Sequence, residues 1–218
     1  MRTVVFDLDG TLADTAADLL ASANACFRAL GHGEPLAMAT DSSTALRGGR
    51  PMLRLGFERV GIDWTEVDVE GQYPLLLDYY GQAIAVHTKL YPGAAEAVEQ
   101  LRRDGHATAI CTNKPEGLAE TLLTKLGVRD LFGSLIGADT LSERKPHPSP
   151  YHEAVRRVGG TTSMLVGDTE TDFLTARAAG VPIALVTFGP EGRGVERLEP
   201  DALLESYADL GRVVASLI

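Results

Sequence analysis

The sequence of 218 residues contains only two cysteines, Cys26 and Cys111. Two cysteines provide neither the disulfide framework of a small secreted protein nor the spacing of a zinc site. Each lies among apolar residues, so we expect two buried free thiols. No apolar run approaches the ~20 residues that cross a membrane, and the first residues already have a strand pattern rather than that of a leader. We therefore expect a cytoplasmic protein without a membrane anchor.

Positive charge is also scarce. The sequence has 30 Asp and Glu residues against 20 Lys and Arg residues, which gives a formal charge of −10. A chain this acidic is a poor partner for nucleic acid or an anionic membrane, because both attract basic surfaces. We expect neither partner, and an anionic substrate would have to meet a local positive site. We expect a monomer or a weak homodimer.

Two carboxylates stand at the end of the first apolar segment, in the sequence VVFDLDGTL from Val4 to Leu12. If this strand continues to Asp9, the alternation of strand side chains places Asp7 and Asp9 on one side. Two like charges so close repel each other, and a bound cation or a raised pKa of one carboxyl relieves the repulsion. Asp-Gly is also a common turn pair, so this segment alone is equally consistent with a plain strand and turn.

The chain has two regions of different pattern. Helical periodicity without a strand signal extends from about residue 15 to residue 87, and strands alternate with helices after residue 90. Such alternation with short turns predicts a parallel sheet covered on both faces. We therefore predict an α/β fold in which residues 1–14 and 88–218 form a doubly wound, Rossmann-like core domain. Residues 15–87 form an inserted all-helical cap domain.

The apolar spacing also predicts individual elements. In the insert it predicts helices over residues 16–30, 36–46, 51–60 and 66–86, the last with 74 as an alternative start. In the core it predicts helices over residues 94–103, 116–126, 150–158, 172–179 and 207–217. The predicted strands after residue 90 are 106–111, 134–137, 164–166 and 183–187, with an edge strand over 202–204.

Polar residues directly follow three of the predicted strands. Thr112 and Asn113 follow the strand at 106–111, and Asp168 follows the strand at 164–166. Ligands of doubly wound sheets bind beyond the carboxyl ends of the strands, so these residues should meet Asp7 and Asp9 at one edge. A hard cation makes such a carboxylate cluster tolerable, and all-oxygen ligands with open positions suit Mg²⁺ bound together with a phosphate.

Four segments in combination resemble the haloacid dehalogenase superfamily of phosphohydrolases. They are DLDGTL after the first strand, ICTN after the second, Lys145-Pro146 in a polar loop, and VGDTETD after a later strand. The all-helical insert directly after DLDGTL resembles the helical-cap subclass of that superfamily. The stretches LYPGAAEAVEQLRRDG and VGDTETDFLTARAAGVP are most similar to its phosphoglycolate phosphatase branch. The resemblance covers nearly the whole chain.

The resemblance implies roles for the acidic residues. Asp7 would be the nucleophile that forms an aspartyl-phosphate. Asp9 would protonate the leaving oxygen and then take a proton from the attacking water. Mg²⁺ would be held by Asp7, the main-chain carbonyl of Asp9, and Asp168. Asp172 would orient bound water or Lys145, as part of the metal site.

It also implies the phosphate site. Thr112 and Lys145 would bind the transferring phosphoryl group, where developing charge requires fixed donors. Asn113 would position the substrate, and Gly10 would let the chain turn beneath the phosphate. Each has a plainer alternative: Thr112 could cap the next helix, and Lys145 could be a surface lysine. Asp172 could be only the N-cap of its helix.

The insert is expected to act as a lid that excludes water and selects the substrate. Its best contact candidate is the turn Gly48-Gly49-Arg50, where the amide of Gly49 and the guanidinium of Arg50 could meet a substrate carboxylate. Arg47 or Arg54 could supply the charge instead. The alternative is that these arginines are solvated helix residues, as most charged residues are.

These residues predict an Mg²⁺-dependent phosphomonoesterase acting on a small phosphorylated metabolite, with phosphoglycolate as the first expectation. A sugar phosphomutase would share the core and the cap type, so it stays an alternative. A phosphonate hydrolase is disfavoured, because residues 15–87 contain no lysine for a Schiff base, and a dehalogenase would not need Asp9. A phospho-accepting signalling module has a similar acidic cluster but is shorter and has no helical insert.

Overall fold

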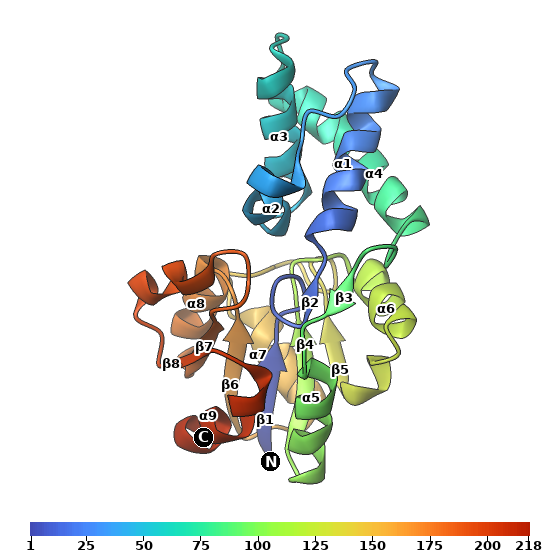
Figure 1. The fold of residues 1–218 in the computed structure, drawn as a ribbon. Coiled ribbons are helices and arrows are strands. Elements are labelled where there is room, and N and C mark those ends of the chain that lie inside the picture. Colours follow the sequence, from blue (N-terminus) through green and yellow to red (C-terminus); the bar gives the residue numbers. More distant parts are fainter. The chain divides into compact units, whose positions relative to one another are not determined.

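The computed structural model describes residues 1–218 and is built on a six-stranded parallel sheet (Figure 1). The strands lie in the order β5-β4-β1-β6-β7-β8. Their bounds are β1 (Arg2–Phe6), β4 (Ala107–Cys111), β5 (Ser134–Ile136), β6 (Thr162–Gly167), β7 (Ile183–Val186) and β8 (Ala202–Leu204). The chain starts in the centre of the sheet and builds it outward in both directions, which is the predicted doubly wound α/β arrangement. The strand order reverses at β1, so the crevice for a ligand opens beyond its carboxyl end.

Helices cover both faces of this sheet. Their bounds are α5 (Ala94–Arg103), α6 (Glu116–Lys125), α7 (Ser149–Arg157), α8 (Glu170–Ala179) and α9 (Leu210–Leu217), with short 3₁₀ turns η1 (Arg129–Leu131), η2 (Gly192–Leu198) and η3 (Tyr207–Asp209). Successive strand residues point to opposite faces. Val5 packs in one cluster with Ala154 of α7 and Ala176 of α8, whereas α5 and α9 pack against each other. The ring centroids of Phe6 and Phe132 lie 6.1 Å apart, with the rings edge to face.

The chain divides into two compact units, Met1–Asp14 with Leu90–Ile218, and Thr15–Lys89. The second unit is helical and contains α1 (Ala16–Ala29), α2 (Met38–Leu46), α3 (Gly49–Val60) and α4 (Glu66–Gln82). Its core includes the buried rings of Phe27 and Phe57, whose centroids lie 5.1 Å apart. The chain passes between the units at two short strands, β2 (Ala13–Asp14) and β3 (Lys89–Leu90).

Within the helical unit, the buried Asp18 near its first residues accepts hydrogen bonds from residues near its last. One Asp18 oxygen accepts the main-chain amide of His87 at 2.9 Å, and the other accepts the amide and hydroxyl of Thr88 at 2.9 and 2.7 Å. The side chain therefore satisfies main-chain donors at the point where the chain leaves the helices. None of the helices has the length and apolarity needed to span a bilayer.

Most element bounds lie within two residues of the predicted ones, and the differences have local causes. Of the two starts left open for α4, Glu66 is observed, because Thr65 and Asp68 form a capping box there; Pro74 lies inside the helix. The strand β1 ends at Phe6 and does not continue to Asp9, because the amides of Leu12 and Ala13 close a turn onto the carbonyl of Leu8. The last predicted helix is divided into η3 and α9.

Candidate active site

The segment after β1 is a tight turn that places its two acids in different surroundings. Both Leu12 and Ala13 donate their amides to the carbonyl of Leu8, at 3.0 and 3.1 Å. Gly10 has φ +81°, a conformation that glycine adopts without strain, and its amide donates to the carbonyl of Ala13. Gly10 therefore provides the turn itself, and its N–H is engaged within the turn rather than directed to a phosphate.

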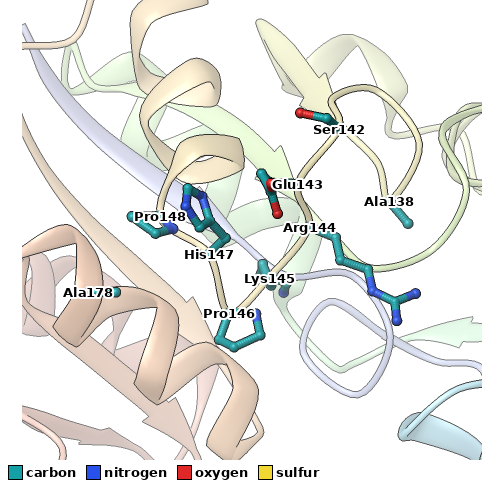
Figure 2. Close-up of a pocket in the computed structure, with 9 residues that line it drawn as sticks. All are labelled: Ala138, Ser142, Glu143, Arg144, Lys145, Pro146, His147, Pro148 and Ala178. Carbon is teal, nitrogen blue, oxygen red and sulfur yellow. The ribbon is translucent and has the colours of Figure 1, made fainter.

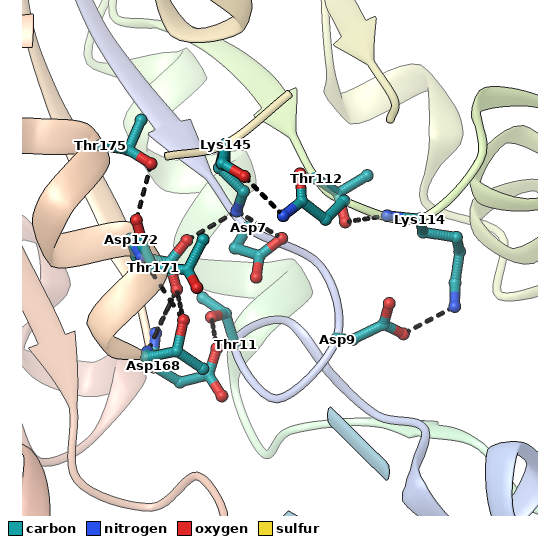
Figure 3. Close-up of polar contacts among 12 residues, drawn as sticks. Asp7, Asp9, Thr11, Thr112, Lys114, Lys145, Asp168, Thr171, Asp172 and Thr175 are labelled. Atoms are coloured by element: carbon teal, nitrogen blue, oxygen red, sulfur yellow. Dashed lines mark hydrogen bonds and ion pairs between the residues drawn. The ribbon is translucent and has the colours of Figure 1, made fainter. Parts of the chain in front are cut away.

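Lys145 is the centre of a buried ionic network (Figure 3). Its Nζ lies 2.6 Å from Oδ1 of Asp172 and 3.0 Å from Oδ1 of Asp7. Only 3% of Lys145 is exposed. Burial by itself lowers the pKa of its ammonium, but the two carboxylates raise it further than burial lowers it. Lys145 is thus a charged residue at the site, and the alternative of a surface lysine is wrong.

Asp172 holds Lys145 in place. It is the N3 residue of α8 and not its N-cap, which is Thr169. Its Oδ2 accepts the Thr169 hydroxyl at 2.7 Å and the amides of Asp168 and Thr169 at 3.2 and 3.1 Å, and its Oδ1 accepts Lys145. The capping box orients the carboxylate, and both oxygens already have donors. Of the two uses that the resemblance implies, the contacts favour the orientation of Lys145.

Asp168 has one engaged and one unengaged oxygen. Its Oδ1 accepts the hydroxyl of Thr11 at 2.8 Å, whereas Oδ2 is buried and has no hydrogen-bond partner. Burial raises the pKa of this carboxyl well above its usual value, and the charges of Asp172 and Asp7 raise it further. An unpartnered buried carboxylate oxygen is costly, so its presence here requires a cation or a proton.

Asp7 is the second such acid. Its Oδ1 faces Lys145 at 3.0 Å but has no hydrogen bond of good geometry. Burial raises the pKa of Asp7 from 3.8 to about 6; Lys145 opposes this rise, and the charges of Asp172 and Asp9 add to it. The carboxyl therefore ionises closer to neutral pH than an ordinary aspartate does.

The donor set fits a hard divalent cation. One carboxylate oxygen each from Asp7, Asp168 and Asp172 lie within 4.8 Å of one another. Three carboxylates against the single ammonium of Lys145 leave two negative charges, which a divalent ion balances. The unpartnered oxygens of Asp7 and Asp168 are the atoms suited to bind it.

Asp9 is paired with a residue that the sequence analysis missed. The Nζ of Lys114 lies 2.9 Å from Oδ1 of Asp9, and the lysine side chain is only 3% exposed. Asp7 and Asp9 therefore each face a different lysine and do not share one strand face. A signal was present in the sequence, because Lys114 directly follows Thr112 and Asn113 at the end of β4.

Thr112 and Asn113 lie at the end of β4 as predicted. The hydroxyl oxygen of Thr112 accepts the amide of Lys114 at 3.2 Å, so the hydroxyl hydrogen stays available for a ligand. The residue that begins α6 as its N-cap is Pro115, not Thr112. The side-chain amide of Asn113 donates to the carbonyl of Lys145 at 3.0 Å. Asn113 thus positions the loop that carries Lys145, and its contact with a substrate stays a prediction.

In the helical unit, Arg50 forms an ion pair with Glu70. Its guanidinium donates to both carboxylate oxygens of Glu70, at 2.5 and 2.7 Å, and lies 3.7 Å from the centroid of the Tyr73 ring. Gly49 is needed for packing, because a Cβ there would lie 2.9 Å from the Tyr73 ring. The contact of Gly49 and Arg50 with a substrate stays a prediction.

A separate cavity of about 770 Å³ lies along the loop that carries Lys145 (Figure 2). Its lining residues come mainly from residues 138–148, with Ala178 of α8 on the other side. Of these residues only Lys145 belongs to the carboxylate network, and the Nζ of Lys145 is held by Asp7 and Asp172. The cluster of Asp7, Asp168 and Asp172, and not this cavity, is therefore the candidate active site.

Residues 4–186 match the family model described as haloacid dehalogenase-like hydrolase. The chain belongs to this family. A phosphoglycolate phosphatase of Mesorhizobium japonicum is 38% identical over 212 residues, which cover 94% of this chain and 90% of the relative. The predicted resemblance is thus confirmed at the level of the family and of its phosphoglycolate phosphatase branch.

Solved structures of this family share the fold along almost the full chain. A predicted phosphoglycolate phosphatase from Haemophilus somnus 129pt superposes with a TM-score of 0.85 at 25% identity, covering 97% of this chain and 96% of that one. CbbY from Rhodobacter sphaeroides, solved in complex with phosphate, superposes with a TM-score of 0.77 at 25% identity over 96% of both chains. This haloacid dehalogenase-like hydrolase therefore has the expected α/β core with a helical insert.

Proposed function

We propose that the protein is an Mg²⁺-dependent phosphomonoesterase of a small carboxylate-bearing metabolite, with phosphoglycolate as the first candidate. The observation that carries the proposal is the buried group of Asp7, Asp168 and Lys145, in which two carboxylate oxygens have no hydrogen-bond partner. The phosphoglycolate phosphatase of Mesorhizobium japonicum, 38% identical, supports the choice of substrate class.

In the first half of the reaction, an Asp7 carboxylate oxygen attacks the phosphorus of the substrate. A bond forms between that oxygen and phosphorus while the bond to the leaving oxygen breaks, and Asp9 donates a proton to the leaving oxygen. Lys145 and the hydroxyl hydrogen of Thr112 stabilise the charge on the phosphoryl oxygens. Lys114, 2.9 Å from Asp9, holds the acid in position.

In the second half, water attacks the phosphorus of the aspartyl-phosphate and Asp9 accepts its proton. The bond between phosphorus and Asp7 breaks, so the carboxylate and inorganic phosphate are restored. Asp7, the main-chain carbonyl of Asp9, and Asp168 would hold Mg²⁺. When bound, the ion would neutralise charge on Asp7 and on the phosphoryl group.

The substrate carboxylate requires a cation of its own, and Arg47 is the best candidate in the helical unit. The other four arginines of that unit, Arg28, Arg50, Arg54 and Arg59, each form an ion pair with an acidic neighbour. Arg47 is exposed at the end of α2 and forms none. Under this proposal the guanidinium of Arg47 binds the substrate carboxylate.

A panel of phosphorylated metabolites assayed with Mg²⁺ tests the proposal. We expect release of inorganic phosphate from small carboxylate-bearing monoesters, and no release after chelation of the metal. Conversion of a sugar phosphate to its isomer without phosphate release would indicate the phosphomutase alternative instead. Failure to hydrolyse any phosphomonoester in the presence of divalent metal would contradict the proposal.

A further inference from the structure

The hydroxyl of Tyr207, in the C-terminal part of the chain, forms a hydrogen bond with the turn after β1. Tyr207 is the first residue of η3 and is 2% exposed. Its hydroxyl donates to the main-chain carbonyl of Thr11 at 2.8 Å, across 196 positions of sequence. A phenylalanine would fill the same space, so packing alone does not require the hydroxyl.

Thr11 in turn forms a hydrogen bond with Asp168 of the acidic cluster. It is fully buried, and its hydroxyl donates to Oδ1 of Asp168 at 2.8 Å (Figure 3). A carboxylate with one oxygen held by a fixed donor has only its other oxygen free for a ligand. That other oxygen, Oδ2 of Asp168, is buried and has no hydrogen-bond partner. The chain Tyr207, Thr11, Asp168 therefore determines which oxygen of Asp168 is presented.

An aromatic cluster keeps Tyr207 in place. The ring of Phe188 lies 5.3 Å from that of Tyr207 and 4.9 Å from that of Tyr91. The amide of Tyr91 donates to the carbonyl of Leu12 at 3.0 Å. Two successive carbonyls of the turn, those of Thr11 and Leu12, are thus held by residues of this cluster. Such fixed partners behind a ligand orient it and tune its affinity.

We propose that Tyr207 is a positioning residue for the cation-binding carboxylate: its hydroxyl fixes Thr11, and Thr11 fixes Asp168 so that Oδ2 faces the divalent ion. This inference rests on the metal dependence proposed above. It assigns a function to the C-terminal segment, which lies outside the four motifs that carry the family resemblance.

Calorimetric titration of the full-length, metal-free protein with MgCl₂ tests the inference without requiring turnover. Tyr207→Phe should weaken Mg²⁺ binding about 10-fold, the lower end for loss of an outer partner of a metal ligand. Thr11→Val should weaken it by about 10–100-fold, because it removes the donor to Asp168 directly. Thr11→Ser keeps that hydroxyl and should bind Mg²⁺ as the wild type does.

Tyr151→Phe is the matched control. It also removes a hydroxyl from a buried tyrosine of the same unit, but that hydroxyl has no hydrogen bond to Thr11 or Asp168. Its Mg²⁺ affinity should equal that of the wild type, whatever it does to thermal stability. In steady-state assays, Tyr207→Phe should need more Mg²⁺ and recover the wild-type kcat when the metal is saturating.

The outcomes are distinct. Weaker binding in Tyr207→Phe and Thr11→Val, with unchanged binding in Thr11→Ser and Tyr151→Phe, supports the inference. Wild-type affinity in a folded Tyr207→Phe variant overturns it and leaves the proposed function intact. Equal weakening in Tyr151→Phe also overturns it, because the effect would then be a general loss of stability. A wild-type protein that binds no Mg²⁺ overturns the inference and the metal-dependent function together.

Discussion

Two buried aspartates in different units of the molecule have opposite electrostatics. Asp41 in the helical unit accepts two hydrogen bonds from Arg59, at 2.5 and 2.6 Å, and the amide of Ala37 at 2.7 Å. The hydrogen bonds from Arg59 are the main cause that lowers its pKa. Asp7 at the end of β1 has no hydrogen bond to its Oδ1, and burial raises its pKa to about 6.

This difference distinguishes a carboxylate that stabilises the fold, Asp41, from carboxylates that are suited to bind a ligand, such as Asp7. Around Asp41 every oxygen has a donor, so the charged form is favoured. Around Asp7 and Asp168 there is less positive charge than negative, so the folded protein without a ligand is less stable than it could be. Functional sites commonly retain such unfavourable groups because the ligand satisfies them.

The substitution Asp7→Asn should have the largest effects. It should lower the activity and raise the stability of the metal-free protein. Activity should fall by about 10⁴-fold or more, as for the loss of other nucleophiles. The raised pKa means that ionised Asp7 destabilises the metal-free protein by up to about 3 kcal/mol above pH 6. This cost decreases as the pH falls below 6 and is absent below about pH 3.8. Thermal unfolding in EDTA should therefore show a more stable variant at pH 7.5, with a smaller gain at pH 5.

A less stable Asp7→Asn variant at pH 7.5 would mean that Lys145 needs the Asp7 charge more than Asp7 is harmed by burial. That result would remove the contrast with Asp41.

Asp168→Asn should abolish stabilisation by the metal. A ligand that binds only the folded state stabilises it by about 2.7 kcal/mol when its concentration is 100 times its Kd. The wild type should show a rise in Tm with Mg²⁺, and the variant should show none. Ca²⁺ and K⁺ titrations at equal ionic strength separate binding from screening. A variant whose Tm still rises with Mg²⁺ as much as that of the wild type would contradict the metal site.

Arg47→Ala should separate substrate recognition from chemistry. Charge-assisted contacts contribute about 1.5–3 kcal/mol, so KM for a carboxylate-bearing substrate should rise about 10–100-fold with kcat little changed. Turnover of p-nitrophenyl phosphate, which has no carboxylate, should not change. Arg54→Ala is the matched control, because Arg54 is already paired with Glu66. Equal effects of the two variants would count against Arg47.

Asp41→Asn should give the smallest change, confined to stability. Loss of one charge from this pair should destabilise the protein by about 1–3 kcal/mol, reduced by the partial exposure of Arg59. Because its folded pKa is lowered, the Asp41 contribution is present at neutral pH and is lost as the pH falls through that value. Urea unfolding of the wild type and the variant at pH 7.5 and pH 3.5 measures the loss of stability and its dependence on pH. The pH trend should be opposite to that from Asp7.

The core of the site was predictable because its residues follow strands. Asp7, Thr112 and Asp168 each come directly after an apolar segment, and the parallel topology brings strand ends to one edge. The pairing of Asp9 with Lys114 was not predictable in the same way. It depends on side-chain directions beyond the ends of β1 and β4, on which the strand period has no influence.

The helical unit was predictable in its elements and less so in its contacts. Helical periodicity located α1 to α4, but it does not show that Glu70 and Tyr73 of α4 engage Arg50. Ion pairs between helices depend on how those helices pack, which a single chain does not specify locally. Tyr207 is similar: the sequence predicted it as a helix start, and only the fold brings it to Thr11.

The central claim is that Asp7 attacks the substrate and is phosphorylated. It is tested most directly by quenching the enzyme in acid during turnover with Mg²⁺ and a hydrolysed substrate, reducing with borohydride, and sequencing the peptides by mass spectrometry. Reduction of an aspartyl-phosphate at this position would convert Asp7 to homoserine, in proportion to the enzyme trapped. We expect homoserine at Asp7 and at no other aspartate. Full turnover without modification of Asp7, or with modification of another residue, would contradict the account.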